Sequence, residues 1–237
     1  MKKVLVDKKG RKYLWDKGDL HTSLGIVKER SIKKGRKAKS HLKKEFLIYP
    51  ASFTDKLRKI KRGPAIMLPK DVGAIIAYTG IDKESVVLDA GVGSGVLSSN
   101  LANVVKKVIS YEKNKEFLKI AKKNFEFLNQ KNISLKEKDI YKKIDEKNLD
   151  LITLDLAEPW RVLKSAEKAL KEGGFLVCYL PNVTQVIKLV EETKQFHFIK
   201  EKIIELIERE WDVEDLKARP KSQIIGHTGF LCFLRRF

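Results

Sequence analysis

Two rhythms of hydrophobic and polar positions divide the chain near residue 65. In the first 65 residues, short apolar pieces alternate with turns rich in Gly and Lys, which is typical of a small β-barrel or sandwich. The expected strands are Val4–Val6, Lys12–Trp15, Leu24–Val27 and Glu45–Tyr49. We expect residues 31–44, the most basic segment, to form a mobile loop or hairpin tip and not a helix. Residues 59–65 are expected to be a hinge.

From residue 66 onward, short buried strands alternate with amphipathic helices, which predicts a parallel, doubly wound sheet. The expected strands are 85–91, 107–112, 133–140, 149–156 and 173–181, and the expected helices are 69–80, 94–103, 114–129, 161–170 and 183–194. Two final apolar stretches, 198–213 and 226–237, have no helix between them and predict an antiparallel pair at the sheet edge. The sequence therefore predicts a β-rich domain over 1–65 and an α/β domain over 66–237.

The charge of the chain is concentrated in its first part. The net charge is +19, and residues 1–70 hold 22 basic and 6 acidic side chains, whereas residues 71–237 hold 28 and 25. A basic surface without a partner is one interpretation. A thermophilic composition would raise both signs of charge together, and here only Lys and Arg rise. The segregated charge favours nucleic acid as a partner, with Lys33, Lys34, Arg36 and Lys37 as candidate phosphate contacts.

Other features limit the classes of protein. No apolar run approaches the roughly 18 residues of a membrane span. The sequence MKKVLVDKKG has no signal-peptide pattern, so we expect a cytoplasmic location without membrane contact. Cys178 and Cys232 lie in apolar runs, where we expect buried structural thiols. No His or Cys spacing fits a metal site, so no metal is expected.

Ligands of a doubly wound sheet bind at the carboxyl ends of its strands. The first of these strands ends in VLDAGVGSG, residues 87–95. A dinucleotide loop, G-x-G-x-x-G, fails because its third glycine would be Val96. The pattern D-x-G-x-G-x-G instead favours S-adenosylmethionine (SAM). We expect Glu112 to bind the ribose hydroxyls and Asp139 to bind the adenine amino group. The candidate cofactor residues are Asp89, Gly91, Gly93, Ser94, Gly95, Val96, Glu112, Asp139, Ile140 and Asp155.

Four stretches together resemble the tRNA (adenine-N1)-methyltransferase family that acts on the T-loop. They are PKDVG at 69–73, VLDAGVGSG with YE at 111–112, LDLAEPWRVL at 154–163 with YLPNVTQV at 179–186, and REWDV…RP…GHTGFL at 209–231. The resemblance spans about residues 60–237. Two positions depart from the family pattern: Leu68 stands where an aromatic residue or His is common, and Asp89 replaces a Glu.

The resemblance implies a class I SAM-methyltransferase fold, SAM as methyl donor and adenine N1 of the tRNA T-loop as acceptor. The position modified would be 58, with 57 also modified in archaeal members, and the assembly would be a homotetramer. The resemblance also implies that Tyr179 lies in the adenine pocket. Trp160 is either a substrate contact or a core residue, and His227 is either a ligand or a loop-ordering residue.

The chemistry itself suggests a role for Asp155. Adenine N1 is a neutral nucleophile that needs alignment more than a strong base, and the ring becomes cationic as the methyl group arrives. A carboxylate that accepts the exocyclic N6–H would orient the ring and stabilise that charge. Because N1 lies on the Watson–Crick edge, the base must be flipped out. The alternatives are a methyltransferase with another substrate (another RNA base, protein isoaspartate or a small molecule), a non-catalytic RNA-binding subunit, and a nicotinamide-dependent oxidoreductase.

Overall fold

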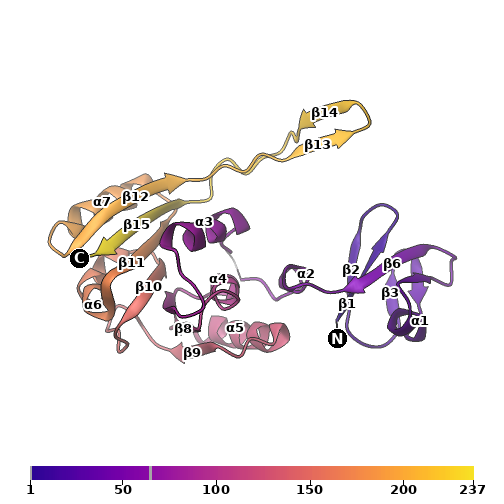
Figure 1. Cartoon of the computed structure of the whole chain (residues 1–237), viewed down its shortest axis with the longest axis horizontal. Helices are drawn as coiled ribbons and strands as arrows, with labels where there is room; N and C mark the ends of the chain where they lie inside the picture. Colours follow the sequence, from indigo (N-terminus) through magenta and orange to yellow (C-terminus); the bar gives the residue numbers. More distant parts are fainter. Residues whose placement is uncertain (1, 64–65) are drawn as a thin grey trace. The chain divides into compact units, whose positions relative to one another are not determined.

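The computed structural model describes residues 2–63 and 66–237. The chain forms two compact units, Met1–Ile60 and Lys61–Phe237 (Figure 1). The division falls slightly before the predicted boundary after residue 65. Residues 64 and 65 of the predicted hinge lie outside the described residues.

The first unit is a small β domain with its own core. Its main sheet has the strand order β2-β1-β6-β5, and all neighbouring strands are antiparallel. The strands are β1 (Lys3–Asp7), β2 (Lys12–Trp15), β5 (Lys37–Lys39) and β6 (Glu45–Pro50), with a separate hairpin of β3 (Leu20–Thr22) and β4 (Gly25–Val27). Two short helices, α1 (Glu29–Lys34) and α2 (Phe53–Leu57), complete the unit. The core is built from Leu5, Trp15, Val27, Ile32, Ala38, Phe46 and Ile48.

The prediction of a mobile loop or hairpin tip over 31–44, and not a helix, is correct for the hairpin of β5 and β6 and wrong for residues 31–34, which are helical. This segment contains the end of α1 and the whole of β5, which pairs with β6. Two apolar side chains inside the basic run decide its structure, since Ile32 is fully buried and Ala38 is almost so. The Lys and Arg side chains between them remain on the surface. Burial of two residues therefore orders a segment whose composition is typical of a loop.

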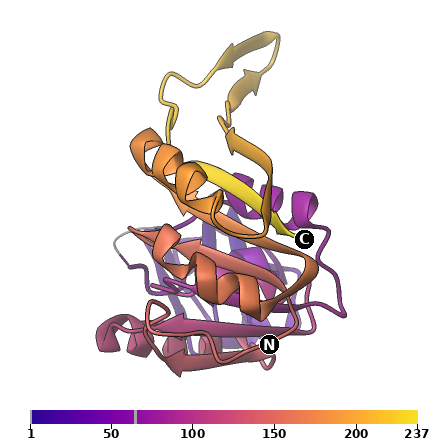
Figure 2. The ribbon, with the colours of Figure 1, turned by 90° about the vertical axis from the view of Figure 1, so that its left-hand side faces the viewer.

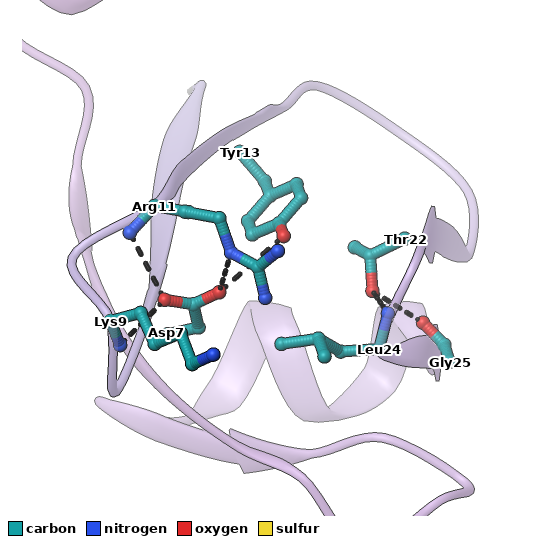
Figure 3. Close-up of polar contacts among 7 residues, drawn as sticks. All are labelled: Asp7, Lys9, Arg11, Tyr13, Thr22, Leu24 and Gly25. Atoms are coloured by element: carbon teal, nitrogen blue, oxygen red, sulfur yellow. Dashed lines mark hydrogen bonds and ion pairs between the residues drawn. The ribbon is translucent and has the colours of Figure 1, made fainter.

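Side-chain bonds to the backbone hold the turns of this unit (Figure 3). In the turn after β1, the buried carboxylate of Asp7 accepts from the backbone N–H of Lys9 at 2.8 Å and of Arg11 at 3.0 Å. The guanidinium Nε of Arg11 donates to the same carboxylate at 2.6 Å. In the next hairpin, the hydroxyl of Thr22 donates to the Gly25 carbonyl at 2.8 Å. Short polar side chains close turns in this way, so hydrogen bonds hold the turns of this basic unit in one conformation.

The second unit contains a seven-stranded sheet with the order β12-β15-β11-β10-β7-β8-β9. Strands β7 to β11 are parallel, as predicted, and β12 and β15 add antiparallel pairs at one edge. The bounds are β7 (Val86–Ala90), β8 (Lys107–Glu112), β9 (Ile133–Glu137), β10 (Leu149–Asp155), β11 (Leu170–Leu180), β12 (Phe198–Glu205) and β15 (Phe230–Arg236). Cys178 and Cys232 are cross-strand neighbours and are free, buried thiols, as expected.

Helices cover both faces of this sheet. Their bounds are α3 (Pro69–Thr79), α4 (Val96–Leu101), α5 (Lys115–Leu128), α6 (Leu163–Ala169) and α7 (Val183–Thr193), with a 3-10 turn η1 (Pro159–Val162) before α6. Apolar residues of α6 and α7 share one core cluster with β10 and β11, and those of α3 and α4 share another with β7 and β8. Pro69 opens α3 and Gly80 caps it, as the sequence predicts.

The segment between β12 and β15 differs from the prediction of one long strand over 198–213. Strand β12 ends at Glu205, and a separate hairpin of β13 (Trp211–Glu214) and β14 (Lys217–Pro220) follows. We call residues 206–229 the arm. The arm extends beyond the edge of the sheet (Figure 2). The charged residues 208–210 follow shortly after the end of β12 and are exposed.

Candidate active site at the carboxyl ends of the parallel strands

The glycine loop after β7 contacts the end of β10 directly. Gly91 has a φ of +84°, and a Cβ at this position would lie 2.1 Å from the carbonyl oxygen of Asp155. At Gly95, where φ is +81°, a Cβ would lie 2.4 Å from the ring of Phe125. Only glycine tolerates both the left-handed backbone and these close approaches. The loop is therefore pressed between β10 on one side and α5 on the other.

The carboxylate of Asp89 lies beneath the loop and is fully enclosed by protein. It accepts hydrogen bonds from the hydroxyls of Ser98 and of Thr153, the latter at 2.8 Å. Burial raises the pKa of this carboxyl group, against the effect of the two hydroxyls. Its bonds point toward α4 and β10. Asp89 thus links the end of β7 to the helix after the glycine loop and to the neighbouring strand, and its contact with the cofactor stays a prediction.

Glu112 ends β8 with both carboxylate oxygens held by backbone amides. Oε2 accepts from the N–H of Gly93 at 3.0 Å, and Oε1 accepts from the N–H of Asn114 at 2.8 Å. The bond from Gly93 attaches the end of the second strand to the glycine loop. Each oxygen keeps a lone pair that can accept from a hydroxyl of a ligand. Glu112 therefore ends the second strand, as predicted, and its contact with ribose stays a prediction.

The next loop carries Asp139 and Ile140. The Oδ1 atom of Asp139 accepts from the backbone N–H of Tyr141 at 3.1 Å, and its Oδ2 lies 4.0 Å from the ammonium of Lys113. Ile140 is buried. Within the glycine loop and the start of α4, Ser94 and Val96 are also buried. All of these cofactor candidates belong to loops at the same edge of the sheet.

Two supports of these loops carry no obvious signal in the sequence. The amide of Asn124, on α5, donates at 2.8 Å to the carbonyl of Ser94 and at 2.8 Å to that of Lys61. The buried phenol of Tyr111 donates to Glu146, which also accepts from Lys136 at 2.6 Å. The only hint of either role was a polar residue, Asn124, on the apolar face of a predicted helix.

Asp155 and Tyr179 are direct neighbours across the pair β10–β11. Burial raises the pKa of the Asp155 carboxyl group to about 6, and the nearby Asp89 contributes in the same direction. The Asp155 side chain nevertheless keeps one side open to solvent. Burial also raises the pKa of the Tyr179 phenol, so this group is neutral and protonated at pH 7. The two residues present an acceptor and a neutral hydroxyl beside the glycine loop.

Trp160 and His227 both have structural contacts. Trp160 is half-buried against the core, and the ammonium of Lys188 lies 4.3 Å from its ring centroid. His227 contacts the carboxylate of Glu205 through Nδ1 and the carbonyl of Pro181 through Nε2 at 2.7 Å. The hydrogen bond to Glu205 raises the pKa of His227 most. These contacts favour a core role for Trp160 and a loop-ordering role for His227.

The four basic candidates lie in the first unit. Lys33 forms an ion pair with Glu29 at 3.1 Å, and Lys34, Arg36 and Lys37 are exposed. Lys34 and Lys37 line a cavity of about 810 Å³, together with Arg30. Over residues 2–63 and 66–237, no group of His, Cys, Asp and Glu is arranged to hold a metal ion. In the same described parts, no helix is long and apolar enough to cross a membrane.

The raised pKa of Asp155 predicts a pH-dependent effect on stability. A carboxyl group with a folded pKa near 6 and an ordinary value near 3.8 costs stability when ionised. That cost is fully present above about pH 6 and disappears as the pH falls through the window between these values. Asp155→Asn should therefore raise the melting temperature at about pH 8, with a gain that shrinks toward about pH 4.5.

Differential scanning calorimetry across this range measures the effect, with Glu191→Gln, at an exposed position of α7, as the control. A gain in melting temperature that does not change with pH would contradict a raised pKa of Asp155.

The comparisons with known proteins agree on one family. A family model described as the tRNA methyltransferase complex GCD14 subunit matches residues 58–218. A tRNA (adenine(57)-N(1)/adenine(58)-N(1))-methyltransferase TrmI from Methanocaldococcus jannaschii is 38% identical, over 98% of this chain and 94% of the relative. A tRNA (adenine(58)-N(1))-methyltransferase TrmI from Thermus thermophilus is 35% identical, over 99% and 96%.

Solved structures agree with the sequence comparisons. A SAM-dependent O-methyltransferase from Thermotoga maritima matches with a TM-score of 0.91 at 28% identity, covering 99% of this chain and 92% of that one. The tRNA (m1A58) methyltransferase TrmI from Aquifex aeolicus matches with a TM-score of 0.84 at 27% identity, covering 100% and 97%. The predicted class I methyltransferase fold and SAM as cofactor are confirmed. The chain belongs to the tRNA methyltransferase family of the GCD14 subunit.

Proposed function

We propose that the protein transfers the methyl group of SAM to N1 of adenine 58 in the T-loop of tRNA. The observation that carries the proposal is the position of Asp155 at the end of β10. Its backbone carbonyl lies against Gly91 of the glycine loop, and Tyr179 is its neighbour on β11. The names of the relatives from M. jannaschii and T. thermophilus support this position, and the first also includes adenine 57. A cytoplasmic location, where tRNA is found, is part of the proposal.

The residues at the strand ends fit SAM. The glycine loop lets a ligand approach the backbone, and Glu112 offers lone pairs to the two ribose hydroxyls. Asp139 and Ile140 provide an acceptor and an apolar surface for the adenine of the cofactor. When bound, SAM supplies a methyl group on a positively charged sulfur. The supports at Asn124 and Tyr111 fix the loops before binding, so less ordering entropy is lost.

Asp155 then acts on the substrate adenine. As an ionised carboxylate it accepts the N6–H of the base, which turns N1 toward the methyl group. Positive charge develops on the ring during transfer, and the fixed carboxylate stabilises it more than it stabilises the neutral base. The phenol of Tyr179 lies next to this carboxylate and limits where the ring can lie. Neither group takes the proton of N1, because neutral adenine N1 carries none.

The basic first unit binds the phosphate backbone of the tRNA. A T-loop adenine has to leave its stack before its Watson–Crick edge can reach Asp155, at a cost of about a few kcal/mol. Contacts from Lys34, Arg36 and Lys37 to phosphates, without information about sequence, can offset this cost. The concentration of positive charge in this unit and the tRNA methyltransferase family of the chain support the assignment.

We also propose that the chain assembles as a homotetramer through the arm. Isolated two-stranded hairpins are marginally stable in water, and the arm exposes many large apolar side chains. They are Ile207, Trp211, Val213, Leu216, Ile224 and Ile225, with exposed fractions between 50% and 104%. A second copy of the chain offers the same surface, and symmetric association of two arms buries both, which gives a dimer; two such dimers form the proposed tetramer.

Methylation of unmodified tRNA tests the activity. Wild-type protein with labelled SAM should produce N1-methyladenine at position 58, and nucleoside mapping also tests position 57. Asp155→Ala should slow transfer by about 10²-fold, the loss of one preorganised electrostatic group, with SAM affinity nearly unchanged. Glu191→Ala, which removes an exposed carboxylate from α7, is the control. Absence of N1-methyladenine contradicts the function, and full turnover of Asp155→Ala contradicts the role of that residue.

The salt dependence of binding tests the grip on phosphates. Replacing Lys34 and Lys37 with Ala should weaken tRNA binding and lower the slope of log Kd against log salt by about 1.5 to 2, because two phosphate contacts are lost. Binding is measured between about 50 and 200 mM salt. Lys164 and Lys168, exposed on α6, provide a control pair of equal charge. An unchanged slope in the Lys34/Lys37 variant would remove these residues from the interface.

Sedimentation or light scattering tests the assembly. The wild-type protein should have the mass of four chains. Replacing Trp211, Val213 and Leu216 with Ser should yield smaller species with an unchanged melting transition of the monomer fold, because these three side chains belong to neither core cluster. Ile187→Ser, at an exposed apolar position of α7, is the control. A tetramer that survives the triple substitution would exclude the arm as its interface.

A further inference from the structure

Two motifs far apart in the sequence meet beside Tyr179. Lys70 belongs to the PKD stretch and Thr228 to the GHTGF stretch. The ammonium of Lys70 donates to Asp71 Oδ1 at 2.8 Å and to the hydroxyl of Thr228 at 2.6 Å. The side chain of Lys70 is only 9% exposed, which is unusual for a lysine. Such burial needs an explanation in terms of what the charge does there.

Asp71 completes a closed set of contacts. Its side chain is 1% exposed, and its Oδ2 accepts from the hydroxyl of Thr228 at 3.1 Å. A buried ion pair contributes little net stability against apolar residues of the same volume, because both charges are desolvated. The effect of these contacts is to fix the positions of the three side chains, since each is bonded to the other two. The set therefore fixes the hydroxyl of Thr228 in one position and one orientation.

The position of the Thr228 hydroxyl affects the neighbouring side chain of Tyr179. A threonine hydroxyl has one hydrogen and two lone pairs. The hydrogen goes to Asp71 and one lone pair accepts from Lys70, so one lone pair remains to accept from a neighbouring hydroxyl. The phenol of Tyr179 is the neighbouring hydroxyl, and in a bond between the two it would be the donor. Beside Thr228, a Cβ on Gly229 would lie 2.7 Å from the Tyr179 ring, so the backbone of this segment also packs on the ring.

We propose that Lys70, Asp71 and Thr228 form a positioning triad that holds the Tyr179 phenol beside Asp155 and thereby sets the rate of methyl transfer. The proposal rests on the proposed function, because it assigns these residues to the adenine side of that site. None of the three is placed at the glycine loop or at the ends of β8 and β9. Their loss should therefore affect transfer and not the binding of SAM.

A double-mutant cycle between Thr228 and Tyr179 tests the proposal, because a residue that acts through another shows no separate effect once its partner is changed. Thr228→Val keeps the volume and removes the hydroxyl. It should lower kcat with tRNA by about tenfold, the value of one hydrogen bond, with the Kd for SAM unchanged. Thr228→Ser should restore kcat to within about twofold of wild type, since it keeps the hydroxyl. Tyr179→Phe should be slow as well, and the double variant should be no slower than Tyr179→Phe alone.

The outcomes separate this inference from the proposed function. If the double variant loses kcat by the product of the two single losses, Thr228 acts independently of Tyr179. That result would overturn the triad. Full turnover of Thr228→Val alongside a slow Tyr179→Phe overturns the triad alone. Full turnover of Tyr179→Phe overturns both the triad and the role of Tyr179. Wild-type protein that makes no N1-methyladenine overturns the proposed function itself.

Lys70 is tested separately because its removal strands a buried carboxylate. Lys70→Met should lower the melting temperature as well as kcat, whereas Lys70→Met combined with Asp71→Leu should regain the melting temperature and not kcat. Recovery of both in the double variant would show that the pair serves stability alone and would overturn its positioning role.

Discussion

The contact between the backbone of Gly91 and the carbonyl of Asp155 is the constraint on which the site depends. It follows from the register of the sheet, in which Ala90 pairs with Leu154 and Asp155 pairs with Tyr179. One residue of slip in β10 would turn Asp155 to the other face of the sheet. The apolar residues of β10, buried on both faces, prevent that slip. Packing in the core thus fixes the position of the carboxylate.

The same position explains why the carboxyl group is both costly and useful. Desolvation raises its pKa to about 6 and the nearby Asp89 adds repulsion, while one side of the side chain stays open to solvent. The fold therefore gives up stability at neutral pH to keep a negative charge at this place. Charges held at such a cost are common at functional sites because they need no reorganisation during the reaction.

The sequence was sufficient to predict the features that depend on local hydrophobic pattern and on where each strand ends. The parallel sheet and the place of the glycine loop and of Asp155 at one edge follow from alternating elements, since the carboxyl ends of parallel strands share that edge. The pairing of Asp155 with Tyr179 comes from the strand order of the structure. The helix at residues 31–34 was not predicted, because the burial of Ile32 and Ala38 outweighs the basic composition of the segment. The meeting of Lys70 and Thr228 could not be derived, because a contact over 158 positions leaves no local signal.

The order of strands also determines when the site becomes complete. Strand β15 lies between β12 and β11, although it follows both in the chain. During synthesis, β7 to β11 and the glycine loop can therefore assemble while the strand that flanks β11 is still being made. Thr228 and Gly229 arrive on that same late segment, directly before β15. An unfinished chain would accordingly contain the glycine loop and the ends of β8 and β10 before Thr228 and Gly229 are in place beside Tyr179.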